Sequence, residues 1–102
     1  MTNECLSIEI AREKHGEDSR SVRLSIEASG AVLVDAQDLG RLVEATFGDG
    51  DYEFWVRVKP DALARLAFEL LKDKYGGRAD AVDDLRRYCE ARGVAHDFET
   101  WA

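Results

Sequence analysis

The sequence has little proline, cysteine, methionine and histidine, and these scarcities exclude several classes of protein. It contains one proline, two cysteines, one methionine and two histidines among 102 residues. Cys5 and Cys89 are too few for the disulfide framework of a small secreted domain, so we expect two reduced thiols in a cytoplasmic chain. No apolar run reaches the length of a signal peptide core or a membrane span. We therefore expect no membrane partner.

The motifs of common catalytic and metal sites are also missing. The histidines and cysteines stand apart in the sequence, without the paired spacing of a zinc site. Acids alternate from Asp49 to Glu53 as at the start of a calcium loop, but Phe54 and Pro60 occupy the positions that need glycine and glutamate. No nucleophile elbow, Walker motif or dinucleotide-binding motif occurs. We expect no catalytic residue, metal or cofactor, and predict that the protein is not an enzyme.

The pattern of apolar residues predicts a single α+β domain spanning residues 1–102. Alternation of apolar and polar residues predicts strands over residues 4–12, 20–28, 31–34, 51–59 and 94–101. Spacings of three and four predict helices from Asp35 or Asp38 to Phe47, from Pro60 to the Gly76-Gly77 pair, and over residues 80–92. The expected order is β-β-β-α-β-α-α-β. We predict one mixed or antiparallel sheet of about five strands, with three helices mainly on one face.

The strand predicted over residues 51–59 has two different faces. Its apolar residues at alternate positions should face the core: Tyr52, Phe54, Val56 and Val58. Asp51, Glu53 and Trp55 then face the other way, so Trp55 lies among charged residues. Trp101, on the last predicted strand, has a similar polar setting.

The negative charge of the chain is concentrated in its middle third. The net charge is −7, and residues 24–56 contain seven acids and one base, Arg41. The rest of the chain is close to neutral. Such a region repels nucleic acid and favours a basic protein partner. An ordinary solvated surface would give the same composition.

Carboxylates around exposed tryptophans predict a protein-binding surface. The acids steer a basic partner towards the surface, and the aromatic rings supply the contact energy. The predicted contact set is Asp49, Asp51, Glu53 and Trp55. The predicted periphery consists of Asp35, Asp38, Glu44, Glu99 and Trp101.

Several short stretches carry a resemblance to known proteins. They are Gln37-Asp38-Leu39-Gly40, Phe47-Gly48-Asp49, Asp51-Tyr52-Glu53-Phe54-Trp55, Tyr75-Gly76-Gly77, and Phe98 with Trp101. Together they resemble a group of small bacterial proteins of unassigned function. In size, acidity and element order the chain is also similar to bacterial toxin-immunity proteins, which inhibit a toxin by binding it.

The leading hypothesis is a binding protein that docks a basic protein, such as a toxin or a nucleic-acid-binding enzyme. An immunity protein is its concrete form. One alternative is a nucleic-acid mimic that inhibits a bacterial defence complex, as anti-restriction and anti-CRISPR proteins do. A second is a small ligand-binding or enzymatic domain, which would need a closed apolar pocket. A third is self-association, as a homodimer, through a strand edge or the tryptophan face.

Overall fold

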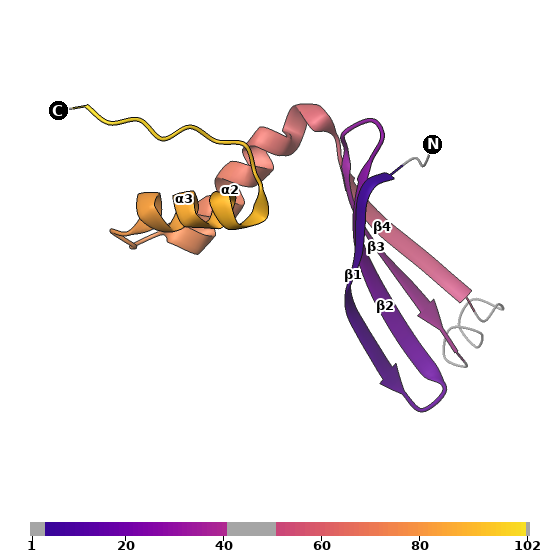
Figure 1. The fold of residues 1–102 in the computed structure, drawn as a ribbon. Coiled ribbons are helices and arrows are strands. Elements are labelled where there is room, and N and C mark those ends of the chain that lie inside the picture. Colours follow the sequence, from indigo (N-terminus) through magenta and orange to yellow (C-terminus); the bar gives the residue numbers. More distant parts are fainter. Residues whose placement is uncertain (1–3, 41–50, 102) are drawn as a thin grey trace. The chain divides into compact units, whose positions relative to one another are not determined.

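The computed structural model describes residues 4–40 and 51–101 and shows an α+β fold. The chain forms two compact units, Met1–Leu66 and Ala67–Ala102. The first contains a four-stranded sheet, and the second contains helical structure (Figure 1). The predicted α+β class is therefore confirmed.

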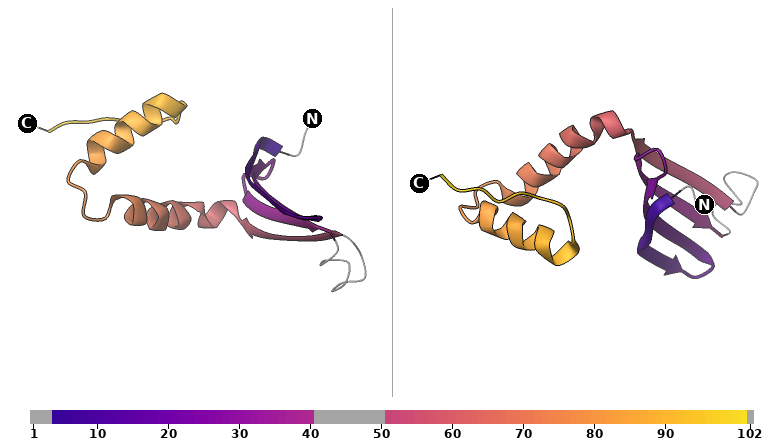
Figure 2. Two further views of the ribbon diagram at one scale, coloured as in Figure 1. Left: turned by 90° about the horizontal axis from the view of Figure 1, so that it is seen from below. Right: turned by 45° about the horizontal axis from the view of Figure 1, so that its top comes forward.

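The sheet is an antiparallel meander. Its strands are β1 (Glu4–His15), β2 (Asp18–Glu27), β3 (Val32–Leu39) and β4 (Asp51–Val58). They pair in the order β1-β2-β3-β4, so β1 and β4 are the edge strands of the described sheet. The strands twist along their length, as side-chain sterics require (Figure 2). The predicted three-strand start and the strand at Asp51 are confirmed.

Strand pairing separates an apolar face from a polar face. Rows of directly paired residues run across the four strands. The apolar face consists of the rows Leu6-Ile26-Val32-Val58, Ile8-Leu24-Val34-Val56, Ala11-Val22-Ala36-Phe54 and Glu13-Arg20-Asp38-Tyr52. The polar face consists of the rows Ser7-Ser25-Leu33-Arg57, Glu9-Arg23-Asp35-Trp55, Arg12-Ser21-Gln37-Glu53 and Lys14-Ser19-Leu39-Asp51. The alternation along β4 therefore follows the sequence prediction.

Pairing between β1 and β2 shifts register at two places. One shift lies between Glu9 and Ala11, where Ile10 has no paired residue on β2. An extra residue of this kind is a β-bulge, and it changes which residues share a face. In the strand predicted over residues 4–12, Ile10 is the next alternate apolar residue after Leu6 and Ile8 and would share their face. In the structure Ala11 takes the place expected for Ile10 on the apolar face.

Burial on the apolar face is slight. Ala36 is 6% exposed, but Phe54 is 37% exposed and Val56 is 66% exposed. On the polar face, Ser25 is 1% exposed, and its hydroxyl lies 3.2 Å from that of Ser7. The residues predicted to form the core therefore share one face, but that face is largely open to solvent.

Two predicted elements differ in the structure. Residues 35–39, expected to begin a helix, belong to β3, where they pair with both β2 and β4. The rest of that predicted helix lies outside the described residues. Residues 94–101, expected to form a fifth strand, have no strand pairing in the described chain. His96 instead makes a local contact, with its Nδ1 atom 2.7 Å from the carbonyl oxygen of Val94.

The other two predicted helices are present. A 3₁₀ turn at Pro60–Ala62 leads into α2 (Leu63–Tyr75), and proline suits this position because its missing N–H is not needed there. Helix α3 (Ala81–Arg92) ends at Gly93, which has a left-handed conformation with φ of 65°. None of the described helices is long and apolar enough to cross a membrane.

Within the second unit, polar contacts join the end of α2 to the start of α3. The Tyr75 hydroxyl donates a hydrogen bond to the Asp84 carboxylate at 2.6 Å, and this raises the pKa of Tyr75 to about 12. Arg78 forms ion pairs with Asp80 at 2.8 Å and with Asp84 at 3.6 Å. The side chains that link these two helix ends are therefore already paired with each other.

Candidate partner-binding surface

Three residues of the predicted contact set and one of the predicted periphery lie together on the polar face of the sheet. Asp35 pairs directly with Trp55 across β3 and β4, and Glu53 and Asp51 follow on the same face of β4. We call these four residues the acidic strip. Asp51 and Glu53 are exposed, and Trp55 is 55% exposed. The strip therefore combines carboxylates with an accessible aromatic ring.

The carboxylates of the acidic strip are largely available. Asp51 accepts a hydrogen bond from the Gln37 side-chain amide at 3.1 Å, which leaves its charge uncompensated. Asp35 and Glu53 make no hydrogen bond or ion pair with residues 4–40 or 51–101. Arg23 pairs with Asp35 in register, but its guanidinium donates to the Ser7 hydroxyl at 3.0 Å. The three carboxylates can therefore attract a cation from outside the chain.

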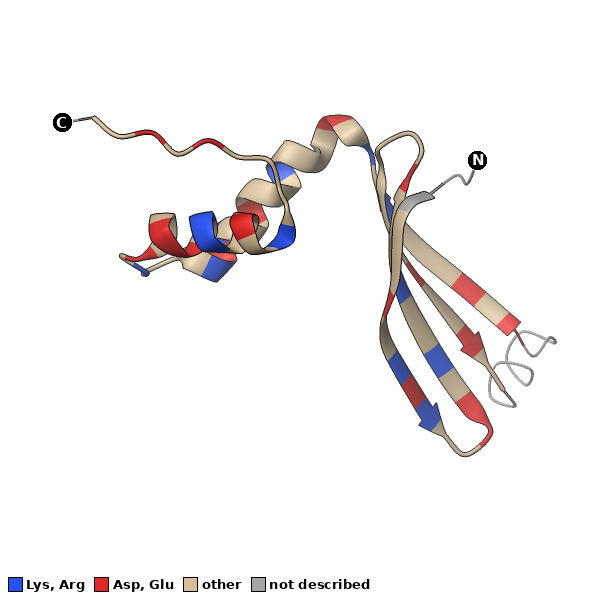
Figure 3. Ribbon diagram, viewed as in Figure 1, with Lys and Arg blue, Asp and Glu red and all other residues tan. Residues whose placement is uncertain are grey.

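Other acids of the middle third are neutralised by arginines. Arg20 donates two hydrogen bonds to Asp38, at 2.6 and 2.7 Å, and these lower the pKa of the Asp38 carboxyl. Arg57 donates to Glu27 at 2.6 and 3.1 Å, which lowers the pKa of Glu27. Both arginines lie outside residues 24–56. The count of charges within that segment therefore overstated the number of carboxylates without an ion pair. Figure 3 shows the mixture: β3 and the start of β4 carry acids, while bases are frequent on β1 and β2.

The remaining predicted residues are not part of the strip. Asp38 belongs to the apolar face, opposite the strip. Asp49 and Glu44 lie outside the described residues. Glu99 and Trp101 belong to the second unit, in an exposed segment without strand pairing among the described residues. The structure therefore brings together Asp35, Asp51, Glu53 and Trp55.

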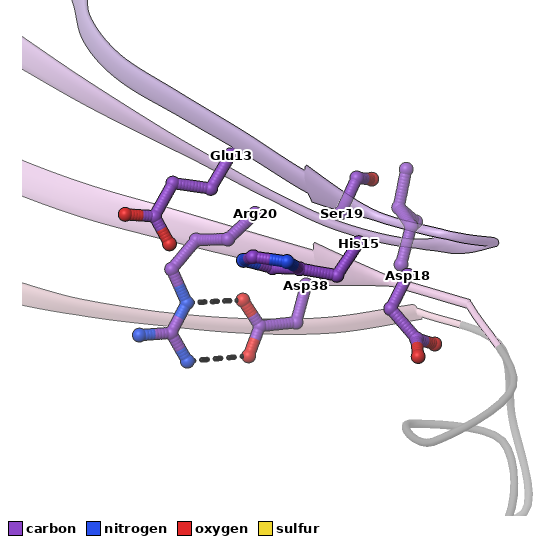
Figure 4. A pocket seen from close by; sticks show the side chains of 7 residues that line it. Glu13, His15, Asp18, Ser19, Arg20 and Asp38 are labelled. Atoms are coloured by element: carbon purple, nitrogen blue, oxygen red, sulfur yellow. Dashed lines mark hydrogen bonds and ion pairs between the residues drawn. The ribbon is translucent and has the colours of Figure 1, made fainter.

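A cavity that the sequence did not predict lies at the β1–β2 turn. It has a volume of about 190 Å³, and it is lined by Glu13, His15, Asp18, Ser19, Arg20, Asp38 and Leu39. Figure 4 shows the Arg20 guanidinium facing the Asp38 carboxylate within this cavity. In the sequence His15 stands apart from other candidate site residues. Its place beside the Arg20–Asp38 ion pair follows from the pairing of the strands, which the sequence does not specify.

The chemistry available in this cavity is limited. Its volume is below the roughly 300–1,000 Å³ of typical ligand sites. Its arginine is already bound to a carboxylate of the same chain. Within the described ranges, no group of three or more His, Cys, Asp or Glu residues could hold a metal ion. The cavity therefore gives no support to a catalytic site of the kind that acts on a small molecule.

Comparison with known proteins gives no relative from which a function could be transferred. No family model, no curated protein and no solved structure matches the chain. The resemblance to small bacterial proteins stays a prediction. Function is therefore inferred from the acidic strip itself.

Proposed function

We propose that this protein is a non-enzymatic binding protein that docks a basic protein partner through the acidic strip. The proposal rests on one observation: Trp55 is more than half exposed and pairs directly with Asp35, a carboxylate without an ion pair in the described chain. Exposed tryptophans are frequent contact residues in protein interfaces because they bury a large area at small entropic cost. Nearby free carboxylates add attraction for arginine and lysine.

The arrangement fits a charged partner in two ways. A partner's guanidinium group can stack on the Trp55 ring and donate hydrogen bonds to Glu53 or Asp35 beside it. The uncompensated charges also accelerate encounter with a basic surface, and salt weakens this effect. An immunity protein that blocks a toxin's basic active site is the concrete form of this proposal, since carboxylates can occupy a site built for phosphate.

A nucleic-acid mimic is less well supported. Alternate residues on one face of a strand are about 7 Å apart, close to the spacing of phosphates along one DNA strand. Asp51 and Glu53 meet this spacing, but Trp55 and Arg57 follow on the same face of β4. A mimic needs a longer uninterrupted row of carboxylates, and the described part of β4 has two.

The test compares three forms of the full chain as bait for proteins of the native host. The first is the wild type, and the second carries Asp35→Asn and Glu53→Gln. The third is a charge-matched control with Asp73→Asn and Asp97→Asn, two exposed acids of the second unit. A basic protein should be retained by the wild type and the control but lost by the second form.

The captured protein is then titrated against purified chains. We expect Asp35→Asn with Glu53→Gln to slow association by about tenfold at low salt, with a smaller effect at high salt. Trp55→Ala should weaken binding by about 1–3 kcal/mol, mainly through faster dissociation. If all three baits retain the same proteins with equal affinity, the acidic strip is not the docking surface.

A further inference from the structure

The outer side of β4 ends the described sheet, and its side chains are exposed. No described strand pairs with β4 on the side away from β3. Every residue from Asp51 to Arg57 is exposed. An edge of this kind offers unpaired backbone N–H and C=O groups that can accept a further strand. The charges of β4 indicate which strand fits this edge.

The charges along β4 are arranged so that the strand complements itself. On the polar face, the order from the start of the strand is acid, acid, tryptophan, base, base: Asp51, Glu53, Trp55, Arg57 and Lys59. In an antiparallel pair the second strand runs in reverse, so its bases lie opposite the acids of the first strand. Lys59 has an extended backbone, with φ of −68° and ψ of 156°, and continues the pattern beyond Val58.

We propose that two copies of this chain pair antiparallel through their β4 edges, about a twofold axis at Trp55. This register places Asp51 opposite Lys59 of the second copy and Glu53 opposite its Arg57, whose guanidinium also donates to Glu27 of its own chain. Because the axis is twofold, each contact occurs twice, which gives four attractive pairs. The two Trp55 rings meet at the axis. The result is one continuous antiparallel sheet formed by two chains.

The register centred on Trp55 is favoured over its neighbours. A shift must move by two residues to keep the polar and apolar faces aligned. A shift of two residues in one direction leaves only the contact of Asp51 with Arg57 within residues 51–59. A shift in the other direction leaves only the contact of Glu53 with Lys59. On the apolar face, the central register pairs Phe54 with Val56, an aromatic and β-branched pair of the kind that stabilises sheets.

The proposed pairing does not rest on the proposed function. It uses the edge of β4 and a second copy of the chain, and the purified protein alone suffices to test it. A failure of partner capture therefore leaves the pairing intact, and a monomeric chain leaves the docking proposal intact. Both involve Asp51 and Glu53, so pairing and partner binding compete for these carboxylates.

The test is a charge swap at Asp51 and Lys59, measured by sedimentation equilibrium of the full chain. Neither side chain forms an ion pair within the described residues, so their reversal leaves the ion pairs of the sheet in place. Over protein concentrations from about 1 μM to 1 mM, the wild type should change from monomer to dimer. Asp51→Lys alone, or Lys59→Asp alone, should raise the dimer dissociation constant at least tenfold, since two attractive contacts become repulsive.

The double variant Asp51→Lys with Lys59→Asp should recover the dimer, because the same contacts form with reversed signs. The control Asp73→Lys changes the net charge as Asp51→Lys does, but it lies on α2 and should leave the dimer unchanged. Circular dichroism checks that each variant is folded. In a background of Trp101→Phe, the emission of Trp55 should also change with protein concentration.

Three results would overturn the pairing. The first is a wild type that is monomeric throughout the concentration range. The second is a single reversal that leaves the dissociation constant unchanged. The third is a folded double variant that stays as weak as the single variants.

Discussion

Gly40 follows β3, and its replacement by alanine tests how closely the β1–β2 turn approaches this point. Gly40 has a φ of 130°, a conformation that residues with a Cβ atom rarely adopt. A Cβ atom here would lie 2.6 Å from the carbonyl oxygen of Glu17 and 2.7 Å from the Cα atom of Asp18. It would also collide with Oδ1 of Asp18. The side-chain oxygen can rotate away, but the backbone atoms can move only if the turn moves.

The expected cost has two parts. A non-glycine residue in such a conformation loses about 1–3 kcal/mol. Displacing a packed turn adds about 1–3 kcal/mol, as for other overpacked sites. We therefore expect Gly40→Ala to lower the free energy of unfolding by about 2–6 kcal/mol.

The matched control is Gly16→Ala, in the same turn. Gly16 has a φ of 63°, and a Cβ atom there would meet nothing within 4 Å. Its replacement should cost only the conformational part, about 1–2 kcal/mol. The two variants then differ by about 1–4 kcal/mol, and with a urea dependence of about 2 kcal/mol per molar their midpoints should differ by roughly 0.5–2 M. The signal is the fluorescence of Trp55 on β4, in a background of Trp101→Phe. Equal midpoints for the two variants would show that no close contact surrounds Gly40.

Two further predictions concern titrating groups. The hydrogen bond from Tyr75 to Asp84 raises the pKa of Tyr75 from 10.0 to about 12, so its stabilising effect is complete below pH 10 and is lost as the pH rises towards 12. An absorbance titration should lose a tyrosine step near pH 12 in Tyr75→Phe, and a wild type without that step would contradict the assignment. Arg20 lowers the pKa of Asp38 below its ordinary value of 3.8, so this contribution is present above that value and disappears as the pH falls through the lowered pKa. Thermal unfolding should therefore separate wild type from Asp38→Asn at pH 7, and the gap should narrow as the pH falls below 3.8; a gap that does not narrow in acid would refute the ion pair.

Local sequence patterns correctly predicted those elements in which every residue favours the same secondary structure. The alternation from Asp51 to Val58 correctly gave both the strand and its two faces. The helix predicted over residues 80–92 ends correctly at Arg92, because Gly93 follows in a left-handed conformation that closes the last turn. These features depend on neighbours in the sequence, so one chain read alone contains the necessary information.

The errors arose where pairing between distant residues decides the structure. Residues 35–38 have weak preference for strands, and Asp35 or Asp38 could cap a helix. In the structure they are held as a strand by pairing on both sides. The last predicted strand failed for the opposite reason. Its alternating pattern is present, but no described strand pairs with it.

The acidic strip was predicted in part. Asp51, Glu53 and Trp55 follow from alternation within one strand. Their nearness to Asp35 depends on the register between β3 and β4, which the sequence does not specify. The same limit explains Asp38, which was grouped with the binding residues but lies on the other face, bound to Arg20. Composition counted its charge but could not show that an arginine neutralises it.

The two edges of the sheet are unequal, and this determines how far any assembly can grow. The β1 edge has two register shifts against β2, one of them the bulge at Ile10, and it carries a run of charged residues near its end. A bulge makes an edge a poor template for a further strand, and the charges of β1 do not show the self-complementary order of those on β4. A β4 edge that pairs with a second β4 edge leaves a β1 edge at each end of the joined sheet. If the proposed dimer forms, growth would stop at two chains, and this would protect the protein from fibril formation.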